Sequence, residues 1–269
     1  MIYIRGHVED FDEWSDKYGC KDWDFKSLLP YFKKAEKNES LSGEYHGTDG
    51  LLHVSDNTYR HPLSLAFIKA GQELGLNYVT DFNARSQQGV GFFQTTTHNG
   101  ARASTSKTYL KRIRENPNFT LKLNALVAKV IIENNRAVGV KCIINGTEYT
   151  FKAKKSVVVS SGSLGSPKIL MLSGIGPREH LNSVGIKAIR DLPVGKNYHD
   201  HMHVSVNATI KTPISIYGED LGLKKIQNGV KWLLTRKGVI SSNILETGAF
   251  IDTNNEGRPD LQAHYLYFE

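Results

Sequence analysis

This sequence contains little cysteine. It also contains neither long apolar runs nor dense basic clusters. The only cysteines are Cys20 and Cys142, too few for a disulfide framework or a thiolate metal site. No apolar run approaches the roughly 20 residues that a membrane-spanning helix needs. The formal net charge is +7, but the basic residues are dispersed among apolar and acidic ones. The sequence therefore predicts no membrane span and no nucleic-acid partner.

The first residues also lack the pattern of a secretory signal, because charged side chains interrupt them from Arg5 onward. Four asparagines match the glycan acceptor pattern: Asn38, Asn118, Asn145 and Asn207. These matches are compatible with a secreted or extracellular parent protein and do not establish one. The localisation is therefore left open.

What is present is the composition of a globular protein, with 269 residues, 39% hydrophobic and 23% charged. Apolar spacing and capping residues predict helices over residues 10–16, 24–32 and 63–74, with a kink or break in the second at Pro30. Another helix is expected from Ser104 to a point before Pro117.

The apolar period then changes from helical to alternating over residues 121–151. Asn134-Asn135 is expected to turn the chain once. Asn145-Gly146 is a strong hairpin signal, because both central residues of that turn need positive φ. The sequence therefore predicts a three-stranded antiparallel meander.

A glycine- and serine-rich stretch, SGSLGSPKILMLSGIGP, follows the uninterrupted valines 157–159. The valines predict a strand buried on both faces. Ser166 and Pro167 suit the start of a short helix over 168–172, and Gly174 suits its end. A ligand can bind at such a strand end, where glycine admits a close backbone and a helix N-terminus attracts an anion. A tight connection without a ligand is the competing interpretation.

The remaining residues predict a helix over 177–184, a strand over 186–191 and a helix over 223–234. From Met202 onward, alternating stretches such as 203–206 predict strands of a different sheet. Further strands are expected at 249–251 and in the final DLQAHYLYFE.

The block from Gly162 to Gly176 resembles the second signature of the glucose–methanol–choline (GMC) oxidoreductases. LLPYFKKAE, YHGTDG, GPREHLNSVGI, DLPVGKN and Asp200-His201 fit that family in order, and MIYIRG resembles the tail of its first signature. The similarity runs over essentially the whole chain and is closest to the glucose-dehydrogenase branch.

The resemblance implies an enzyme that uses FAD to oxidise the CH–OH group of an alcohol or sugar. The implied fold is α/β with mixed α+β character. Residues 1–199 would form an incomplete Rossmann-like FAD-binding domain with an antiparallel β-meander insertion, and residues 200–269 the start of an antiparallel-sheet substrate domain. The implied partners are a small-molecule substrate and an electron acceptor, either a quinone or oxygen.

Eight cofactor-binding residues carry over from the family by position. The residues implied to contact FAD, through side chains or backbone groups, are Met1, Ile2, Val127, Ser161, Gly162, Asn197, Asp200 and His201. Val127 would contact the adenine end of FAD through its backbone and is equally compatible with a core position. No catalytic residue is assigned, because the family's catalytic histidine pair belongs to a more C-terminal segment.

The sequence departs from the family pattern in having no G-x-G-x-x-G turn between a strand and a helix. That turn brings backbone amides and a helix dipole to the FAD pyrophosphate. We therefore expect these residues to be a fragment of the enzyme, with negligible FAD binding and no turnover alone. A non-catalytic GMC-like binding protein is the alternative.

Two other site types are conceivable. His199, His201 and His203 alternate and would share one face of a strand, as metal ligands could. The preceding Gly195-Lys196-Asn197 marks a loop instead, so no metal site is expected. A serine hydrolase is disfavoured because Gly162-Ser163-Leu164-Gly165 lacks the G-x-S-x-G register.

Overall fold

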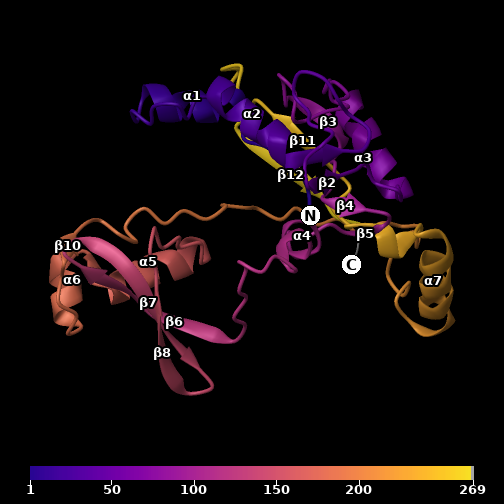
Figure 1. Ribbon diagram of the computed structural model, residues 1–269. Helices are drawn as coiled ribbons and strands as arrows, with labels where there is room; N and C mark the ends of the chain where they lie inside the picture. The colour runs from indigo at the N-terminus through magenta and orange to yellow at the C-terminus, as the bar shows by residue number, and fades with distance from the viewer. Residues whose placement is uncertain (268–269) are drawn as a thin grey trace. The chain divides into compact units, whose positions relative to one another are not determined.

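The computed structural model describes residues 1–267 of the chain. The backbone divides into two compact units: Met1–Asn116 with the residues from Thr209 onward, and Pro117–Ala208 (Figure 1). The boundary predicted from the sequence is a different one: it lies between residues 199 and 200 and would separate a cofactor domain from a substrate domain. That boundary stays a prediction.

The first unit contains helices at its start and a small sheet shared by distant segments. Its elements are α1 (Val8–Asp16), α2 (Phe25–Ala35), β1 (Glu36–Asn38), β2 (Leu52–Val54), α3 (Pro62–Glu73), β3 (Gly89–Phe92), β4 (Thr97–His98), β5 (Ala101–Arg102), the π-helix η1 (Ser106–Leu110), α4 (Lys111–Ile113), α7 (Gly222–Thr235), the 3₁₀ helix η2 (Val239–Ser241), β11 (Thr247–Ile251) and β12 (Leu261–Tyr265).

The helices of this unit form where capping and spacing predict them. The Asp24 carboxylate accepts a hydrogen bond from the Ser27 backbone amide and caps α2. α2 continues through Pro30 to Ala35, so the predicted kink or break does not end the helix. In α3, Pro62 occupies the first turn and Gly75 follows the end at a φ of 90°.

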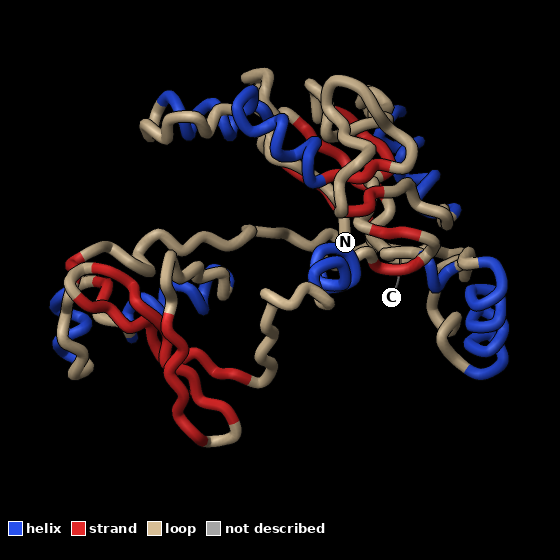
Figure 2. The backbone as a smooth tube through the Cα atoms, viewed as in Figure 1, coloured by secondary structure: helices blue, strands red, loops and turns tan. Residues whose placement is uncertain are grey.

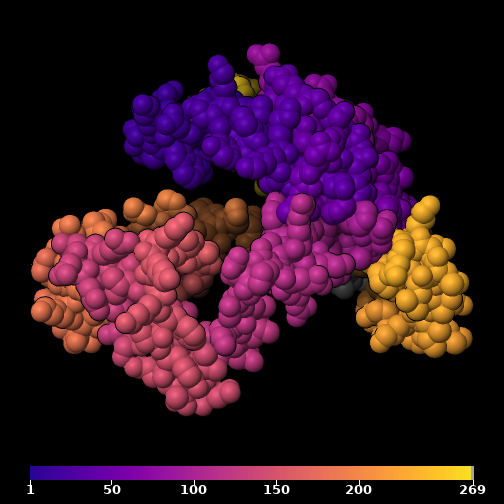
Figure 3. Space-filling model, in the orientation of Figure 1, coloured from indigo at the N-terminus to yellow at the C-terminus, as the bar shows by residue number. Residues whose placement is uncertain are grey.

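The core of the first unit lies on an antiparallel sheet in the order β12-β11-β3 (Figure 1). α3 packs against β3 and β11, where Ile68, Val90 and Ala249 form one buried cluster. Phe82, Phe93 and Phe250 form a second. Residues 89–92 thus pair with residues 247–250, so the sheet joins segments far apart in the sequence. In the space-filling view the N-terminal part of the chain, coloured indigo to purple, forms one continuous packed body (Figure 3).

The second unit is built around a β-meander, as predicted. Its elements are β6 (Ala125–Glu133), β7 (Arg136–Ile144), β8 (Thr147–Lys152), α5 (Gly162–Leu172), β9 (Ile175–Gly176), α6 (Arg178–Ser183) and β10 (Arg190–Asp191). Asn134, Asn135, Asn145 and Gly146 all have positive φ, which identifies both hairpin turns. The strands pair antiparallel in the order β6-β7-β8.

Helix α5 is longer than the predicted 168–172 segment and begins at Gly162, not at Ser166. Pro167 consequently lies within the helix. The end is as predicted, with Ser173 as the cap and Gly174 at a φ of 86°. The Ser173 hydroxyl accepts a hydrogen bond of 2.8 Å from the Val130 amide, which attaches α5 to β6.

Two predicted strands are wrong. Residues 157–159 are extended without strand pairing, and Val158 is 82% exposed. A parallel strand depends on partners from elsewhere in the chain, and no described segment supplies one here. Residues 203–206 also form no strand and lie in a long irregular segment (Figure 2). Of the strand predicted over 186–191, only Arg190–Asp191 pairs, parallel to β9.

The predictions for the C-terminal part are confirmed. α7 covers the helix predicted over 223–234, and β11 covers 249–251. Of the strand predicted in the final DLQAHYLYFE, β12 forms residues 261–265, and the last two residues of that stretch lie outside the described ones. Among residues 1–267, no helix has the length and apolar character required to cross a membrane.

Candidate functional site

Six of the eight predicted cofactor residues belong to the second unit, and Met1 and Ile2 belong to the first. Within the second unit these six residues occupy three places. Val127 lies on β6, Ser161 and Gly162 begin α5, and Asn197, Asp200 and His201 lie on the irregular segment after β10.

The start of α5 has the features of an anion-binding helix terminus. Gly162 has a φ of 80°, a conformation that side-chain-bearing residues rarely adopt. No side chain caps the first turn, and the Ser161 amide donates instead to the Ser166 hydroxyl at 2.9 Å. Residues 161–164 are exposed, so the first-turn amides that no side chain caps can donate to a negatively charged group.

Val127 lies beside an irregularity in the β6–β7 ladder. Val127 pairs with Cys142, and Lys129 pairs with the preceding Lys141, so Ala128 is an extra residue between them. Such a bulge leaves backbone groups without ladder partners and is common near functional sites. This geometry is compatible with the predicted main-chain contact at Val127.

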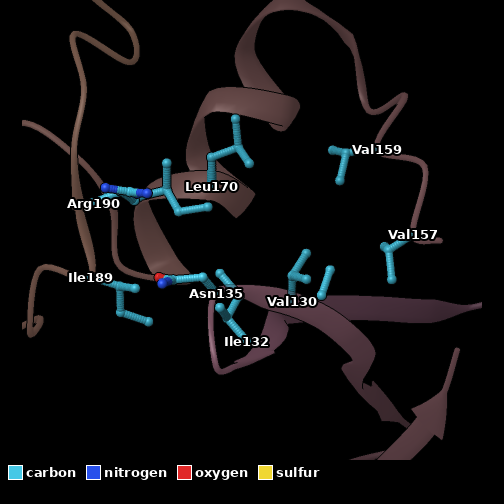
Figure 4. Close-up of a pocket in the computed structure, with 10 residues that line it drawn as sticks. Val130, Ile132, Asn135, Val157, Val159, Leu170, Ile189 and Arg190 are labelled. Carbon is cyan, nitrogen blue, oxygen red and sulfur yellow. The ribbon is translucent and has the colours of Figure 1, made fainter.

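An apolar cavity of about 280 Å³ is lined by residues of β6, of α5 and of the extended segment 157–159. The side chains of Val130 and Ile132 from β6, Leu170 from α5, and Val157 and Val159 from the extended segment surround it (Figure 4). Arg190 and Asn135 supply its polar groups. None of the eight predicted residues is part of its lining. Val157 and Val159 face this cavity instead of the sheet interior that the sequence predicted.

The other predicted residues make local contacts. Asn197, Asp200 and His201 are exposed, and the Asp200 carboxylate accepts a hydrogen bond from the His201 amide at 2.8 Å. Ile2 pairs with Thr95 and packs against the Phe82–Phe93–Phe250 cluster. The Met1 carbonyl accepts from the Thr96 amide. The structure places all eight residues, and their contact with FAD stays a prediction.

A buried ionic network in the first unit was missed by the sequence analysis. The Glu36 carboxylate contacts Arg5 at 2.7 Å and the His46 ring at 3.0 Å, and the other His46 nitrogen contacts Asp81 at 2.8 Å. The side chains of Arg5, Glu36 and His46 are at most 3% exposed. Arg5, Glu36 and His46 all belong to stretches that carry the family resemblance, which is the signal that could have found them.

The charged groups of this network shift one another's pKa values. Burial alone would lower the pKa of His46, but hydrogen bonds to Asp81 and Glu36 outweigh it and raise that pKa to about 9. Burial alone would raise the pKa values of Glu36 and Asp81, but hydrogen bonds from His46 and backbone amides hold both below their ordinary values. His46 is therefore an imidazolium between two carboxylates at neutral pH.

A second buried carboxylate, Glu246, is fully enclosed by neutral donors. It accepts hydrogen bonds from the His61 amide and from the hydroxyls of Ser64, Ser242 and Tyr267. The Tyr267 ring stacks on His61 at a centroid distance of 4.2 Å. Burial, and then the hydrogen bond to Glu246, raise the pKa of the Tyr267 hydroxyl. Sequence reasoning gave no reason to select Glu246.

The residues of the second unit fit part of a dinucleotide. The open start of α5 suits a phosphate, and the β6 bulge offers backbone groups. The glycine-rich turn that cradles a pyrophosphate is not among the 269 residues. The fit is therefore partial and concerns the groups named here.

Known proteins resemble this chain over most of its length. The family profile of GMC oxidoreductase matches residues 1–203. Mitochondrial choline dehydrogenase of Mus musculus is 38% identical over 268 residues, which is 99% of this chain and 45% of that protein. The oxygen-dependent choline dehydrogenase of Brucella canis is also 38% identical over 99% of this chain, and the match covers 48% of that protein. The chain thus spans about half the length of the curated relatives it matches.

Solved structures give the same result for the fold. An FAD-dependent oxidoreductase from Chaetomium thermophilum superposes with a TM-score of 0.82 and 26% identity, over 94% of this chain and 47% of that one. A pyridoxine 4-oxidase from Mesorbium loti has a TM-score of 0.67 and 31% identity, over 72% of this chain and 38% of that one. On the match over residues 1–203, this chain belongs to the GMC oxidoreductase family, whose cofactor is FAD.

Proposed function

We propose that the protein containing this chain oxidises the CH–OH group of a small alcohol or sugar with FAD. The observation that carries the proposal is the family match over residues 1–203. The open start of α5 and the bulge beside Val127 support it, because they offer donors and backbone groups of the kind that a dinucleotide needs.

FAD, when bound, accepts the hydride, and the protein binds and orients both reactants. In our proposal the first-turn amides of α5 donate to a phosphate of the cofactor, with Ser161 and Gly162 shaping the turn. Val127 contributes main-chain contacts. Met1, Ile2, Asn197, Asp200 and His201 complete the proposed cofactor contacts.

The finer proposal is a glucose-dehydrogenase-like enzyme, which rests on the sequence resemblance. The curated relatives named choline dehydrogenase make choline the rival substrate. The test supplies glucose and choline separately to the native protein, with a quinone or oxygen as electron acceptor. Glucose-dependent reduction of the acceptor supports the finer proposal. Turnover of choline alone would retain the alcohol oxidation and overturn the glucose assignment, and inactivity toward a panel of alcohols and sugars would overturn both.

We also propose that the 269 residues by themselves bind FAD negligibly and do not turn over substrate. The reason is that they contain no G-x-G-x-x-G turn. FAD titration of the purified chain, followed by flavin fluorescence, measures this directly. A stoichiometric yellow complex would contradict the proposal. Tight binding of an alcohol without any flavin would instead support a non-catalytic binding protein.

A secreted or extracellular location remains a further proposal. Asn145 and Asn207 are exposed acceptors for glycans. Asn38 is buried, and its side-chain amide donates to Glu36 and Gln94, so it cannot accept a glycan in the folded protein. Removal of N-glycans from the native protein should lower its mass, and an unchanged mass would count against the proposal.

A further inference from the structure

We propose that Glu39, His53 and His98 form a binding site for one divalent transition-metal ion of the zinc class. One ligand atom from each residue lies within 4.8 Å of the other two. Among residues 1–267 this is the one group of three or more such side chains that meets that condition. His199, His201 and His203, the ligands considered from the sequence, do not form such a group.

Backbone pairing brings these residues together. Glu39 follows β1, His53 is the central residue of β2, and His98 ends β4. β1 and β2 pair in parallel, and the Glu39 amide donates to the Val54 carbonyl at 2.9 Å. Ser55 and Thr95 exchange two backbone hydrogen bonds of 2.9 Å, which hold β2 beside the segment that leads into β4. β2 and β4 lie side by side (Figure 1).

The three side chains converge on one point. The Glu39 Oε1 atom lies 3.3 Å from His53 Nδ1 and 2.5 Å from His98 Nδ1. Zinc binds imidazole nitrogen and carboxylate oxygen at about 2.0–2.2 Å, so ligand atoms around one ion lie a little over 3 Å apart. The His53–Glu39 distance already suits that arrangement. The His98–Glu39 distance has to lengthen. The imidazole rings, whose centroids are 4.0 Å apart with planes tilted by 36°, have to open around the ion.

The donor set selects the class of ion. Two imidazole nitrogens and one carboxylate oxygen suit zinc, cobalt, nickel or copper better than magnesium or calcium, which prefer oxygen ligands. The side chains of Glu39, His53 and His98 are 37%, 22% and 45% exposed. An ion can therefore enter from solvent, and water can complete its coordination.

Asn99 provides an outer contact that metal sites of this type require. Its side-chain amide nitrogen lies 3.0 Å from His98 Nε2. When His98 Nδ1 binds a metal, Nε2 carries the proton and needs an acceptor. Rotation of the Asn99 amide by half a turn presents its oxygen to that proton. Asn99 is thus a positioning residue for His98.

The competing interpretation is an ion pair in which one protonated histidine shares the Glu39 carboxylate. Metal uptake distinguishes the two, because an ion pair without a metal site takes up no stoichiometric zinc. The inference is independent of the proposed flavin chemistry, since it concerns residues of the first unit outside the predicted FAD contacts. Failure of one proposal therefore leaves the other standing.

The test is a titration of the metal-free 269-residue chain with Zn²⁺ by calorimetry, and with Co²⁺ by visible absorption. We expect one ion per chain. For cobalt we expect the intense d–d absorption bands of a four-coordinate ion. In Glu39→Gln, His53→Gln and His98→Gln the affinity should fall by about tenfold or more, since each loses one of three ligands. Asn99→Leu should weaken binding less, and Asn99→Asp should restore it.

The matched control is the double variant His180→Gln/His203→Gln, which removes two exposed histidines outside the cluster. We expect it to bind zinc like the unchanged chain. At free zinc a hundredfold above its Kd, binding should lower the ratio of unfolded to folded protein about a hundredfold and raise Tm. Circular dichroism shows whether each variant is folded, and Glu39→Gln changes side-chain shape least. No stoichiometric uptake by the unchanged chain, or equal uptake by the triple variant Glu39→Gln/His53→Gln/His98→Gln, would overturn the proposal.

Discussion

At the scale of single residues, Gly162 is the position where backbone conformation and proposed function meet. Its φ of 80° favours glycine, and a Cβ built there would meet no atom within 4 Å. A larger residue is therefore opposed by the backbone conformation and not by a clash. The same backbone turn exposes the first amides of α5 to a cofactor phosphate in our proposal.

We predict that Gly162→Ala destabilises the second unit by about 1 kcal/mol, the cost of a left-handed conformation for an L-residue. In the native protein the variant should also retain less FAD. Urea unfolding and the flavin content after purification measure the two effects.

Gly229→Ala is the matched control, because Gly229 lies inside α7 without positive φ and with open space where an added methyl group would lie. It should stabilise the chain by up to about 1 kcal/mol, because alanine favours helix more than glycine does. Equal loss of stability and flavin in both variants would contradict the role given to Gly162.

His46 carries a prediction about pH at the same scale. Its pKa is raised to about 9, so its contribution to stability is complete below the ordinary histidine pKa and disappears as the pH rises toward 9. Glu36 and Asp81 have lowered pKa values, so their contributions exist above the ordinary carboxyl range and disappear as the pH falls below it. The free energy of unfolding should therefore be greatest at about pH 5 to 6.5 for this network.

The alkaline decrease should amount to about 2 to 3 kcal/mol, from the size of the shift at a buried histidine. His46→Gln should be less stable at pH 6 and should lose most of the pH dependence between 6.5 and 9. Denaturant unfolding at a series of pH values measures both. His180→Gln, at an exposed position, serves as the control, and an alkaline decrease that persists in His46→Gln would show that His46 is not its source.

At the scale of elements, Glu246 joins β11 to the start of α3 and to the segment after β12. Its carboxylate accepts from the His61 amide and the Ser64 hydroxyl near α3, and from the hydroxyls of Ser242 and Tyr267. All of these donors are neutral, so the carboxylate depends on them for its solvation.

We predict that Glu246→Gln destabilises the first unit by about 1–3 kcal/mol. The glutamine NH2 group would face hydroxyl and amide donors, and those donors would have lost the carboxylate oxygen that accepts their hydrogen bonds. Tyr267→Phe should cost about 1 kcal/mol, since three donors remain to the carboxylate. Thermal unfolding compares the two variants. A Glu246→Gln variant as stable as the unchanged chain would contradict the assignment of Glu246 as the acceptor of these bonds.

The elements that the sequence predicted best have local causes. The meander of β6, β7 and β8 follows from alternation and from two turns whose asparagines and glycine adopt positive φ. The strand predicted at 157–159 is wrong. A run of valines indicates apolar surroundings, but a parallel strand also needs neighbouring strands from other parts of the chain. Val157 and Val159 do reach an apolar cavity, so burial was partly predictable where pairing was not.

At the scale of the whole molecule, the sequence predicted the family and the cofactor but not the buried networks. Glu36, His46 and Asp81 meet through contacts between positions 10 and 35 residues apart. Glu246 meets His61 across 185 positions. The proposed metal ligands are separated in the same way, with Glu39 and His98 being 59 positions apart. Short-range patterns contain no information on such meetings, which depend on strand pairing between distant segments.

Our proposal for the whole molecule is that these residues are part of a flavin enzyme that takes a hydride from an alcohol or sugar. The most direct measurement is the absorption spectrum of the native protein under anaerobic conditions, before and after a panel of alcohols and sugars is added. We expect a flavin spectrum that can be assigned to FAD and that at least one substrate bleaches. A native protein without flavin, or with a flavin that no alcohol or sugar reduces, would contradict it.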